Sequence, residues 1–583
     1  MSRTLAGLCL ALTTLSATAV DAASRPAVEA EHGMVVAAER RSAAIGADIL
    51  RQGGNAIDAA VAVGYAEAVA NPCCGNLGGG GFLVAHLASG RDVFIDFRET
   101  APAAATRTMY LDAAGQPIKG ASLDGWRAVA TPGTVLGLDA ALKDYGTMSR
   151  AAVMAPAIGL ARDGFVLDRA DADIFDAFTA RFRGDPTAAK VFLRPDGSPL
   201  EPGDRLVQAD LAATLQAIAD LGPDAFYRGP IAAKIDAAMR ANGGVLTAAD
   251  LAAYAIGEGA PLACDYRGYR FLSAPPPSSG GATLCEMLDI LEGYDLAGLG
   301  FHSAAGVHLM VEAMRRAYAD RNAFLGDPAF VNNPLDRLLS KDYAARVRAA
   351  IRPDAATPSA EIEPSAGEKS QTTHYSIVDG EGNAVAVTYT INGGFGAGVI
   401  APGTGFFLND EMDDFTIKPG VANLFGLVQG EANAIAPGKR PLSSMAPTIV
   451  MKDGRVALAL GSPGGSRIIT TVLETAVNMI DFGMTPQEAV DAPRFHHQWL
   501  PDVVYAEPYA FSPDTRKLLE SMGYKVVIQA PWSAAEVVAT DAMGQAKEAA
   551  AGNPDSAFSG RMRPGFLYGA SDDRRPAGAA VGE

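Results

Sequence analysis

The clearest pattern along the chain lies between residues 371 and 392, where two runs of β-branched and aromatic residues flank a D-G-E-G-N turn. Such runs on either side of a Gly-rich turn predict a β-hairpin. The segment just before it, residues 354–370, is polar and has few large apolar groups. A segment of this composition does not pack into a core, so we expect it to be exposed or disordered. Thr372 stands at the junction between the two.

Helix and strand patterns cover most of the remaining chain. Residues 41–72 have apolar positions at helical spacing on both sides of a Gly-Gly pair, which predicts helix, turn, helix. The N-L-G-G-G-G-F that follows precedes a predicted strand at 82–87. A dinucleotide-binding loop needs a helix there, so we interpret the glycines as points of close backbone approach.

The two halves of the chain differ in pattern. Residues 130–325 are predicted to be mostly helical, whereas the sequence after 372 is rich in strands until a helix that begins at Ile468. The Gly- and Pro-punctuated segment 414–442 has the length and composition of a mobile lid. Strands from both halves, together with many helices, predict an α/β layered sandwich with one core.

Charge and the N-terminus narrow the classes of function. The 583 residues include 48 basic and 66 acidic side chains, and this net charge of −18 argues against nucleic acid or an anionic membrane surface as a partner. Residues 1–22 have the pattern of a secretory signal peptide. The alternative, a membrane anchor, is disfavoured because the apolar run is short for a bilayer. We therefore expect an exported protein, periplasmic or secreted, with no stable membrane anchor.

Four cysteines follow the signal peptide: Cys73, Cys74, Cys264 and Cys285. Export permits disulfides, yet four cysteines in a chain of this length do not make a disulfide scaffold. Cys73 and Cys74 are adjacent and could bridge each other or separate partners. Small buried thiols are an equally acceptable interpretation, so the pairing stays open.

The junction at Thr372 suggests a chemical hypothesis. A threonine hydroxyl is a weak nucleophile until a base takes its proton, and an N-terminal α-amine, with a pKa of about 8, is such a base. If the chain cuts itself before Thr372, nucleophile and base belong to one residue. The alternative is that two threonines at a strand start reflect β-propensity alone.

Motifs spread along the chain favour the self-cleaving interpretation. They are, in order, N-L-G-G-G-G-F, D-F-R-E-T-A-P, P-P-P-S-S-G-G, T-T-H-Y-S-I-V-D, A-V-T-Y-T-I-N, N-D-E-M-D-D-F, K-R-P-L-S-S-M-A-P-T, G-S-P-G-G-S-R-I-I and P-R-F-H-H-Q-W-L-P. In this succession they resemble the γ-glutamyltransferase family, whose members are also called γ-glutamyl transpeptidases or glutathione hydrolases. The resemblance covers nearly the whole chain after the signal peptide.

The resemblance implies a fold and a maturation step. Members of the family are N-terminal nucleophile hydrolases with a four-layer αββα sandwich. Each is made as a zymogen that cuts itself into two subunits, which stay together as a heterodimer. Here the cut is expected between Gln371 and Thr372, giving a large subunit of residues 23–371 and a small, catalytic subunit of residues 372–583.

The resemblance also implies an activity. Thr372 is expected to attack the γ-glutamyl amide of glutathione or a related compound and to form a γ-glutamyl ester. Water, an amino acid or a peptide then takes the acyl group in a ping-pong reaction, so the enzyme is both a transferase and a hydrolase of glutathione catabolism.

Motif positions identify the expected site residues. Thr390 matches the residue that hydrogen-bonds the nucleophile, and Gly464 and Gly465 match the backbone N–H groups that bind the oxyanion. A γ-glutamyl group carries both an α-carboxylate and an α-ammonium, and it needs binding groups of opposite charge for the two. The expected substrate-binding residues are Arg98, Ser443 and Ser444 for the carboxylate, and Asn392, Glu411 and Asp414 for the ammonium.

These residues also have ordinary interpretations. Arg98 follows a predicted strand and could equally form a surface ion pair. The serine pair at 443–444 follows a proline and suits a turn, and the glycine pair at 464–465 suits a tight connection from strand to helix.

Some positions depart from the family pattern. Glu411 stands where many bacterial relatives have glutamine, and its added charge should strengthen ammonium binding. Gly393 and Gly394 stand where polar residues are common, so the acceptor side should be looser. The insertion at 546–560 has no functional account.

Two adjacent histidines, His496 and His497, are the one pattern that suggests a metal site. No third ligand lies at helical spacing from them, and the family that the chain resembles uses no metal. We therefore interpret both as structural and expect neither a metal nor a cofactor.

Two rival functions remain to be tested. A cephalosporin acylase of the same superfamily cleaves a glutaryl amide, which lacks the ammonium. Asp414 argues against it, because an unpaired carboxylate that faces an apolar position is costly. A catalytically silent, exported binding protein is the other rival, and it predicts ligand binding with neither turnover nor self-cleavage.

Overall fold

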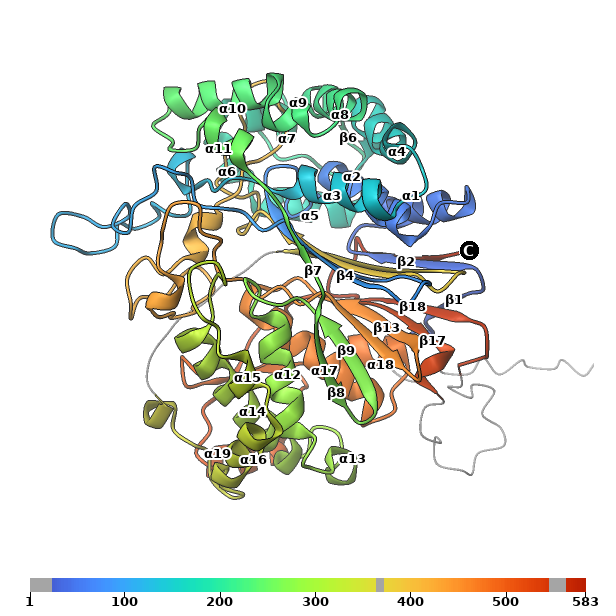
Figure 1. The fold of residues 1–583 in the computed structure, drawn as a ribbon, viewed down its shortest axis with the longest axis vertical. Coiled ribbons are helices and arrows are strands. Elements are labelled where there is room, and N and C mark those ends of the chain that lie inside the picture. The colour runs from blue at the N-terminus through green and yellow to red at the C-terminus, as the bar shows by residue number, and fades with distance from the viewer. Residues whose placement is uncertain (1–23, 363–371, 545–561) are drawn as a thin grey trace, which may run out of the picture.

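Two seven-stranded sheets lie face to face at the centre of the molecule, and helices cover the outer face of each (Figure 1). The structure, a computed structural model, describes residues 24–362, 372–544 and 562–583. All pairings within the two large sheets are antiparallel. The predicted α/β sandwich of four layers is therefore confirmed.

Each large sheet combines strands from both sides of residue 371. The first sheet has the order β19 (Ala579–Gly582), β2 (Gly33–Ala37), β10 (Thr373–Asp379), β11 (Ala384–Thr390), β3 (Gly80–His86), β4 (Asp92–Asp96) and β7 (Gly257–Gly259). The second has the order β1 (Val28–Ala30), β18 (Leu567–Ser571), β17 (Glu536–Thr540), β13 (Arg455–Gly461), β12 (Thr448–Lys452), β9 (Tyr269–Ser273) and β8 (Leu262–Tyr266). The two predicted subunits thus contribute strands to one fold.

The helices divide between the two outer layers in chain order (Figure 1). Outside the first sheet lie α1 (Arg40–Arg51), α2 (Ala56–Ala70), α3 (Thr134–Tyr145), α4 (Arg150–Asp163), α5 (Arg169–Ala177), α6 (Thr179–Arg183), α7 (Pro186–Phe192), α8 (Ala209–Leu221), α9 (Asp224–Tyr227), α10 (Pro230–Ala241) and α11 (Ala248–Ala253). Outside the second lie α12 (Gly280–Leu291), α13 (Leu296–Leu299), α14 (Ala304–Phe324), α15 (Leu335–Leu338), α16 (Lys341–Ala350), α17 (Ile468–Ile480), α18 (Pro486–Asp491) and α19 (Pro513–Ser521). The predicted helix pair around the Gly-Gly turn and the predicted helix from Ile468 are confirmed.

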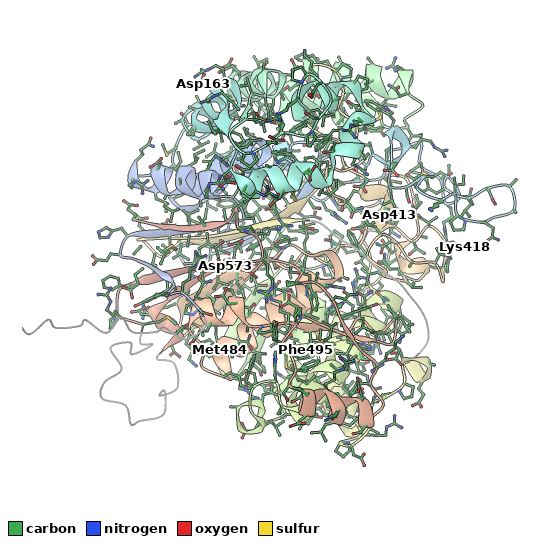
Figure 2. The ribbon with its side chains drawn as sticks, turned by 180° about the vertical axis from the view of Figure 1, so that it is seen from behind. Asp163, Asp413, Lys418, Met484, Phe495 and Asp573 are labelled. Carbon is green, nitrogen blue, oxygen red and sulfur yellow. A yellow bond between two sulfur atoms is a disulfide. The ribbon has the colours of Figure 1, made fainter. Side chains whose placement is uncertain are left out.

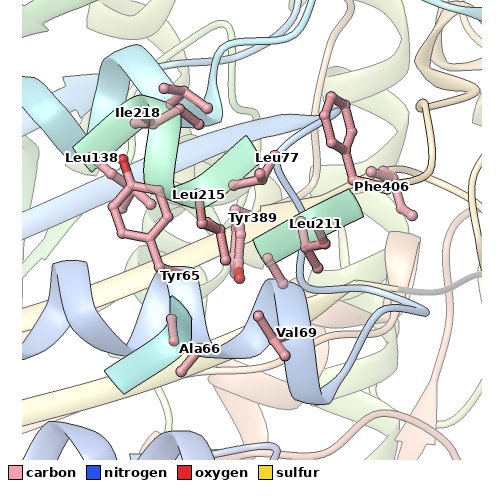
Figure 3. Packing of buried hydrophobic residues seen from close by; sticks show 14 of the residues in the cluster. Tyr65, Ala66, Val69, Leu77, Leu138, Leu211, Leu215, Ile218, Tyr389 and Phe406 are labelled. Carbon is pink, nitrogen blue, oxygen red and sulfur yellow. The ribbon is translucent and has the colours of Figure 1, made fainter. Parts of the chain in front are cut away.

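The predicted hairpin forms the middle of the first sheet. Strands β10 and β11 pair in register from Thr373 opposite Tyr389 to Val378 opposite Ala384. Alternate residues face opposite layers, so Ile377 packs under the helices and Val378 packs toward the second sheet. Figure 3 shows Tyr389 of β11 among side chains of α2, α3 and α8. Each buried aliphatic side chain contributes about 1.5–3 kcal/mol, so apolar burial on both faces holds the hairpin in place.

Close backbone approach explains the glycine run before β3, as the sequence predicted. A Cβ atom on Gly79 would lie 1.9 Å from the carbonyl oxygen of Thr390, and one on Gly81 would lie 2.4 Å from that of Thr388. Because real Cβ atoms do not come this close to backbone, no other residue fits there without a shift. The glycines therefore let β3 pack directly against the end of β11.

The described part of the polar tail before Thr372 is exposed at Asp354, Pro358, Ala360 and Glu361, as expected, but two positions within it are buried, which corrects the expectation there. Thr357 and Ser359 are buried. The Ser359 N–H donates to Asp502 Oδ2 at 2.7 Å, and the Thr357 N–H donates to Glu312 Oε1 at 3.1 Å. Hydrogen bonds from the backbone thus replace the apolar contacts that the segment lacks.

Other expectations concern the cysteines and the chain ends. Cys73 bridges Cys74, and Cys264 bridges Cys285, which decides the pairing that the sequence left open. The signal peptide at 1–22, Gln371 at the predicted cut and the insertion at 546–560 lie outside the described residues. In the described part of the chain, no helix has the length and apolar character needed to cross a membrane.

Candidate active site

The nucleophile candidate lies where β10 begins. The hairpin register, continued by one position beyond the Thr373–Tyr389 pair, sets Thr372 opposite Thr390. Both side chains are buried, and both line one small cavity of about 20 Å³. The Thr390 hydroxyl oxygen accepts a hydrogen bond from the Asn392 N–H at 2.8 Å. The hairpin therefore brings together two hydroxyls that are 18 positions apart in the sequence.

Nearly all the site residues expected from the sequence converge on this cavity. It is lined by Thr372, Thr390, Arg98, Asn392, Glu411, Asp414, Ser443, Ser444 and Gly465. Gly464 instead lines a larger adjoining cavity. With φ of +136°, Gly464 takes a backbone conformation that favours glycine, and a Cβ there would lie 2.0 Å from Ser533 Oγ. Within the described residues, neither glycine N–H donates a hydrogen bond to the protein.

Arg98 is fully buried just after β4. Its backbone N–H donates to Asp96 Oδ1 at 2.8 Å, and its Nε donates to the Pro441 carbonyl at 3.2 Å. Its guanidinium forms ion pairs with Glu411 and, at 2.5 Å, with Asp414. The alternative of a surface ion pair is excluded, because Arg98 has no exposed area.

Burial and charge oppose each other in this cluster. Burial alone would lower the pKa of Arg98, but the neighbouring carboxyls of Glu411, Glu99 and Asp414 raise it above its usual value. Burial raises the pKa of Glu411 and of Asp414, and Arg98 opposes both shifts. Glu99, Glu411 and Asp414 all lie at ion-pair distance from this one guanidinium, so their titrations are coupled. The carboxyls paired with Arg98 thus outnumber its single positive charge.

Two buried acceptor atoms in the same cavity have no partner within the described residues. They are Asn392 Oδ1 and Glu411 Oε2. Asn392 takes a positive φ of 72°, which asparagine tolerates, and its Nδ2 donates to the Asp410 carbonyl at 3.0 Å. Buried acceptors without donors cost free energy, and an ammonium group in the cavity would supply the missing donors.

The serine pair lies beside an arginine that sequence reasoning missed. Arg321 of α14 is buried and lines the cavity, and its Nη2 donates to Ser444 Oγ at 3.0 Å. The Ser443 hydroxyl oxygen accepts from the Met445 N–H at 3.1 Å. Burial lowers the pKa of Arg321 to about 10. The one sequence signal is that Arg321 lies seven residues after Met314, on the same apolar helix face.

The Gly- and Pro-punctuated segment that was predicted to be a lid contributes residues to the wall of this cavity. Residues Phe425 and Leu427 line the cavity, and Asn423 Nδ2 donates to Asp414 Oδ1 at 3.1 Å. Figure 2 shows Asp413, just before this segment, and Lys418 within it at one edge of the sandwich. The segment thus forms part of the cavity wall, and its mobility remains a prediction.

The adjacent histidines lie in a hydrogen-bonded interior. His496 contacts Thr470 Oγ1 at 2.8 Å and Gln498 Oε1 at 2.9 Å, and His497 contacts Asp502 at 3.3 Å. Burial lowers the pKa of His497 to about 4 and that of His496 well below its usual value. In the parts of the chain that the structure covers, no three His, Cys, Asp or Glu side chains group as metal ligands.

Comparisons with known proteins cover almost the entire chain. A family model described as gamma-glutamyltranspeptidase matches residues 42–582. The chain is 55% identical over 567 residues to the glutathione hydrolase proenzyme of Pseudomonas sp. (strain A14), which covers 97% of this chain and 96% of the relative. It is 50% identical over 550 residues to the glutathione hydrolase proenzyme of Escherichia coli (strain K12), covering 94% and 91%.

A solved structure agrees with this fold. The crystal structure of cephalosporin acylase from Bacillus halodurans superposes with a TM-score of 0.82 at 28% sequence identity, and the match covers 97% of this chain and 98% of that one.

Proposed function

We propose that Thr372 carries the chemistry of this chain, which belongs to the gamma-glutamyltranspeptidase family and is a glutathione hydrolase of that family. One observation supports the role of Thr372 above all others. The first residue of the central hairpin shares a buried cavity with Thr390, with a backbone N–H donor at Gly465 and with the ion pairs that Arg98 forms with Glu411 and Asp414.

The proposed reaction has two acyl-transfer steps. The Thr372 hydroxyl oxygen attacks the γ-carbonyl carbon, its proton passes to the Thr372 α-amine, and the C–N bond breaks as the leaving amine takes that proton. A γ-glutamyl ester remains on Thr372. Water, or the amine of an amino acid or peptide, then attacks the ester carbonyl and gives a proton to the Thr372 α-amine, which passes it to the Thr372 oxygen as the C–O bond breaks. Thr390 holds the hydroxyl in position.

Substrate binding uses the charge cluster. The α-ammonium is bound by Asn392 Oδ1, Glu411 and Asp414, and the α-carboxylate by Arg98 with the serine hydroxyls at 443–444. A cavity of about 20 Å³ has room for little more than one water molecule. The γ-glutamyl group must therefore open the ion pairs of Arg98, and its carboxylate replaces one of the protein carboxyls on the guanidinium.

The glycine pair at 464–465 is proposed to stabilise the oxyanion. The N–H groups of Gly464 and Gly465 are the donors proposed for the tetrahedral intermediate, because neither donates to the protein within the described residues. One such donor contributes about 3–4 kcal/mol to transition-state binding.

Maturation creates the nucleophile. The proposed cut between Gln371 and Thr372 yields a large subunit of residues 23–371 and a small subunit of residues 372–583. Each large sheet contains strands of both parts, so the two remain together as a heterodimer. The signal pattern at 1–22 and two disulfides support export to the periplasm or beyond.

The test is a pair of variants at the start of β10. Thr372→Ala should stay one full-length band and should lose at least about 10³-fold in the rate of p-nitroaniline release from γ-glutamyl-p-nitroanilide. Thr373→Ser is the matched control and should be cleaved and active. The small fragment of the wild-type protein should begin T-T-H-Y by N-terminal sequencing. An active, uncleaved protein would contradict the proposal, and so would ligand binding without turnover.

Glutaryl acylase activity is the second candidate, favoured by the structural similarity to a cephalosporin acylase. The buried carboxyl pair argues for a substrate with an ammonium, because a glutaryl group would leave the acceptors of Asn392 and Glu411 without donors. Wild-type kcat/KM for γ-glutamyl-p-nitroanilide should therefore exceed that for glutaryl-p-nitroanilide, and the reverse order would favour the acylase.

A further inference from the structure

A second cavity, of about 850 Å³, lies directly beside the nucleophile cavity. The two share a wall, because residues adjacent in sequence line opposite sides of it. The pairs are Gly465 and Gly464, Asn392 and Gly393, Glu411 and Asp410, and Phe425 and Leu424. The volume lies within the range of about 300–1,000 Å³ that is usual for small-molecule sites.

The position of Thr372 beside this wall determines which part of a γ-glutamyl donor substrate faces the second cavity. The γ-carbonyl must lie against Thr372 and the glycine N–H groups, and the charged end of the γ-glutamyl group lies in the cluster around Arg98. The atoms on the other side of the scissile bond then extend past Gly464, which lines the second cavity. An acceptor amine has to approach the ester from that same side, so leaving peptide and acceptor occupy one space.

Positive charge dominates the lining of this cavity. Its arginines are Arg181, Arg467, Arg574 and Arg575. Arg574 forms ion pairs with Glu507 at 2.6 Å and Asp572 at 3.0 Å. Arg181 pairs with Asp124 at 2.9 Å. The positive charges of Arg574 and Arg181 are therefore balanced by carboxylates of the protein.

Arg575 differs from them. Within the described residues, its guanidinium has no carboxylate at ion-pair distance, and its one side-chain contact is from Nη1 to Cys74 Sγ at 4.0 Å. Burial raises the pKa of nearby Glu67 to about 8 and that of Glu536 well above its usual value, so these carboxyls add little negative charge at neutral pH. The charge of Asp572 also acts on Arg575, but Asp572 forms its ion pairs with Arg494 and Arg574. A partly buried guanidinium without an ion-pair partner of its own is a binding group for a carboxylate.

We infer that Arg575 binds the terminal carboxylate of the peptide that leaves and of the peptide that accepts the γ-glutamyl group. This inference rests on the proposed function and adds to it a preference for acceptors with a free carboxylate. A dipeptide fits the cavity volume, and its amine would face the Thr372 ester while its carboxylate reaches Arg575.

The test compares two acceptors that differ only in charge. With γ-glutamyl-p-nitroanilide as donor, kcat/KM for glycylglycine divided by kcat/KM for glycylglycinamide should exceed one in the wild-type enzyme. Arg575→Gln should lower this ratio about ten-fold or more, because a hydrogen bond to a charged group contributes on the order of a factor of ten to a hundred in binding. Arg575→Lys should keep most of it.

Arg169→Gln is the matched control, because this arginine of α5 has an 80% exposed side chain. It should leave the ratio unchanged. A wild-type ratio near one would overturn the inference, even if Arg575→Gln fails to mature. So would a ratio that changes no more in Arg575→Gln than in the control. If the wild-type enzyme releases no p-nitroaniline, the proposed function fails and this inference fails with it, whereas release with an unchanged ratio overturns this inference alone.

Discussion

Buried carboxyls lie in two places near the start of β10, a first group beside an arginine and a second, Glu67, without one at ion-pair distance in the described part of the chain. Glu411 and Asp414 form ion pairs with Arg98 in the cavity that Thr372 lines. Glu67 has no arginine at ion-pair distance within the described residues. It accepts hydrogen bonds from Asn71 Nδ2 at 2.8 Å and from the Thr373 hydroxyl at 3.2 Å.

The comparison separates the effect of burial from that of charge. Burial raises the pKa in both groups, and it brings that of Glu67 to about 8, so this carboxyl is mostly protonated at neutral pH. Arg98 favours ionisation of Glu411 and Asp414 from ion-pair distance, whereas Arg575 acts on Glu67 only from beyond that distance. Carboxyls paired with a cation in a buried cavity can exchange that partner for an ammonium ligand, whereas a protonated carboxyl serves as a neutral hydrogen-bonding group.

The largest expected effect comes from removing the cation of the first group. In Arg98→Gln the two carboxyls lose their counter-charge, so their pKa values should rise further and the substrate carboxylate should lose its partner. We expect kcat/KM for γ-glutamyl-p-nitroanilide to fall about 10²–10³-fold. The acid limb of its pH profile should move to higher pH. If kcat/KM falls less than ten-fold, the ion pairs of Arg98 do not distinguish the carboxyls beside it from Glu67.

A smaller effect is expected from changing one carboxyl of the first group. Asp414→Asn should shift the ratio of kcat/KM for γ-glutamyl-p-nitroanilide over glutaryl-p-nitroanilide about 10–100-fold toward the glutaryl substrate, because only the former has an ammonium. The control is Asp413→Asn. Asp413 is equally buried but turns away, toward Ser122 Oγ at 2.6 Å and the Leu424 N–H at 2.7 Å. An equal shift in both variants would contradict the assignment.

The smallest expected effect concerns the second group and appears in stability. The pKa of Glu67 is raised from about 4.5 in the unfolded chain to about 8, so its stabilising contribution is complete below pH 4.5 and is lost as pH rises to 8. Glu67→Gln should remove this loss. Between pH 5 and pH 9, the variant should gain about 1–3 kcal/mol relative to wild type.

Urea unfolding at the two pH values measures this difference. Parallel pH dependence in the two proteins would show that Glu67 is ionised in the folded state, and the contrast with Glu411 and Asp414 would then disappear.

Local patterns determined much of the fold. Period-two alternation and the D-G-E-G-N turn specify the hairpin from Thr373 to Thr390, because strand pairing across a short turn has one register that buries both apolar faces. Helical spacing specifies α1 and α2 in the same way. These features depend on neighbours within about twenty residues, which is why the sequence shows them.

The sequence did not predict which polar residues are buried by distant parts of the chain. The segment with Thr357 and Ser359 was expected to be exposed, yet its backbone donates to Glu312 and Asp502. Arg321 was missed because an arginine in a helix is ordinarily exposed, and only the packing of α14 against the serine loop brings it into the cavity.

The sequence by itself thus determined the hairpin, its junction at Thr372 and the kinds of side chain that a γ-glutamyl site requires. The tertiary structure alone decided that Arg98 pairs with both Glu411 and Asp414, and that Gly464 and Gly465 line different cavities. It also left Arg575 without a carboxylate at ion-pair distance in the part of the chain it describes. The pairs of Arg98 join residues more than 300 positions apart, and their distances depend on how the two sheets and the segments between them pack together.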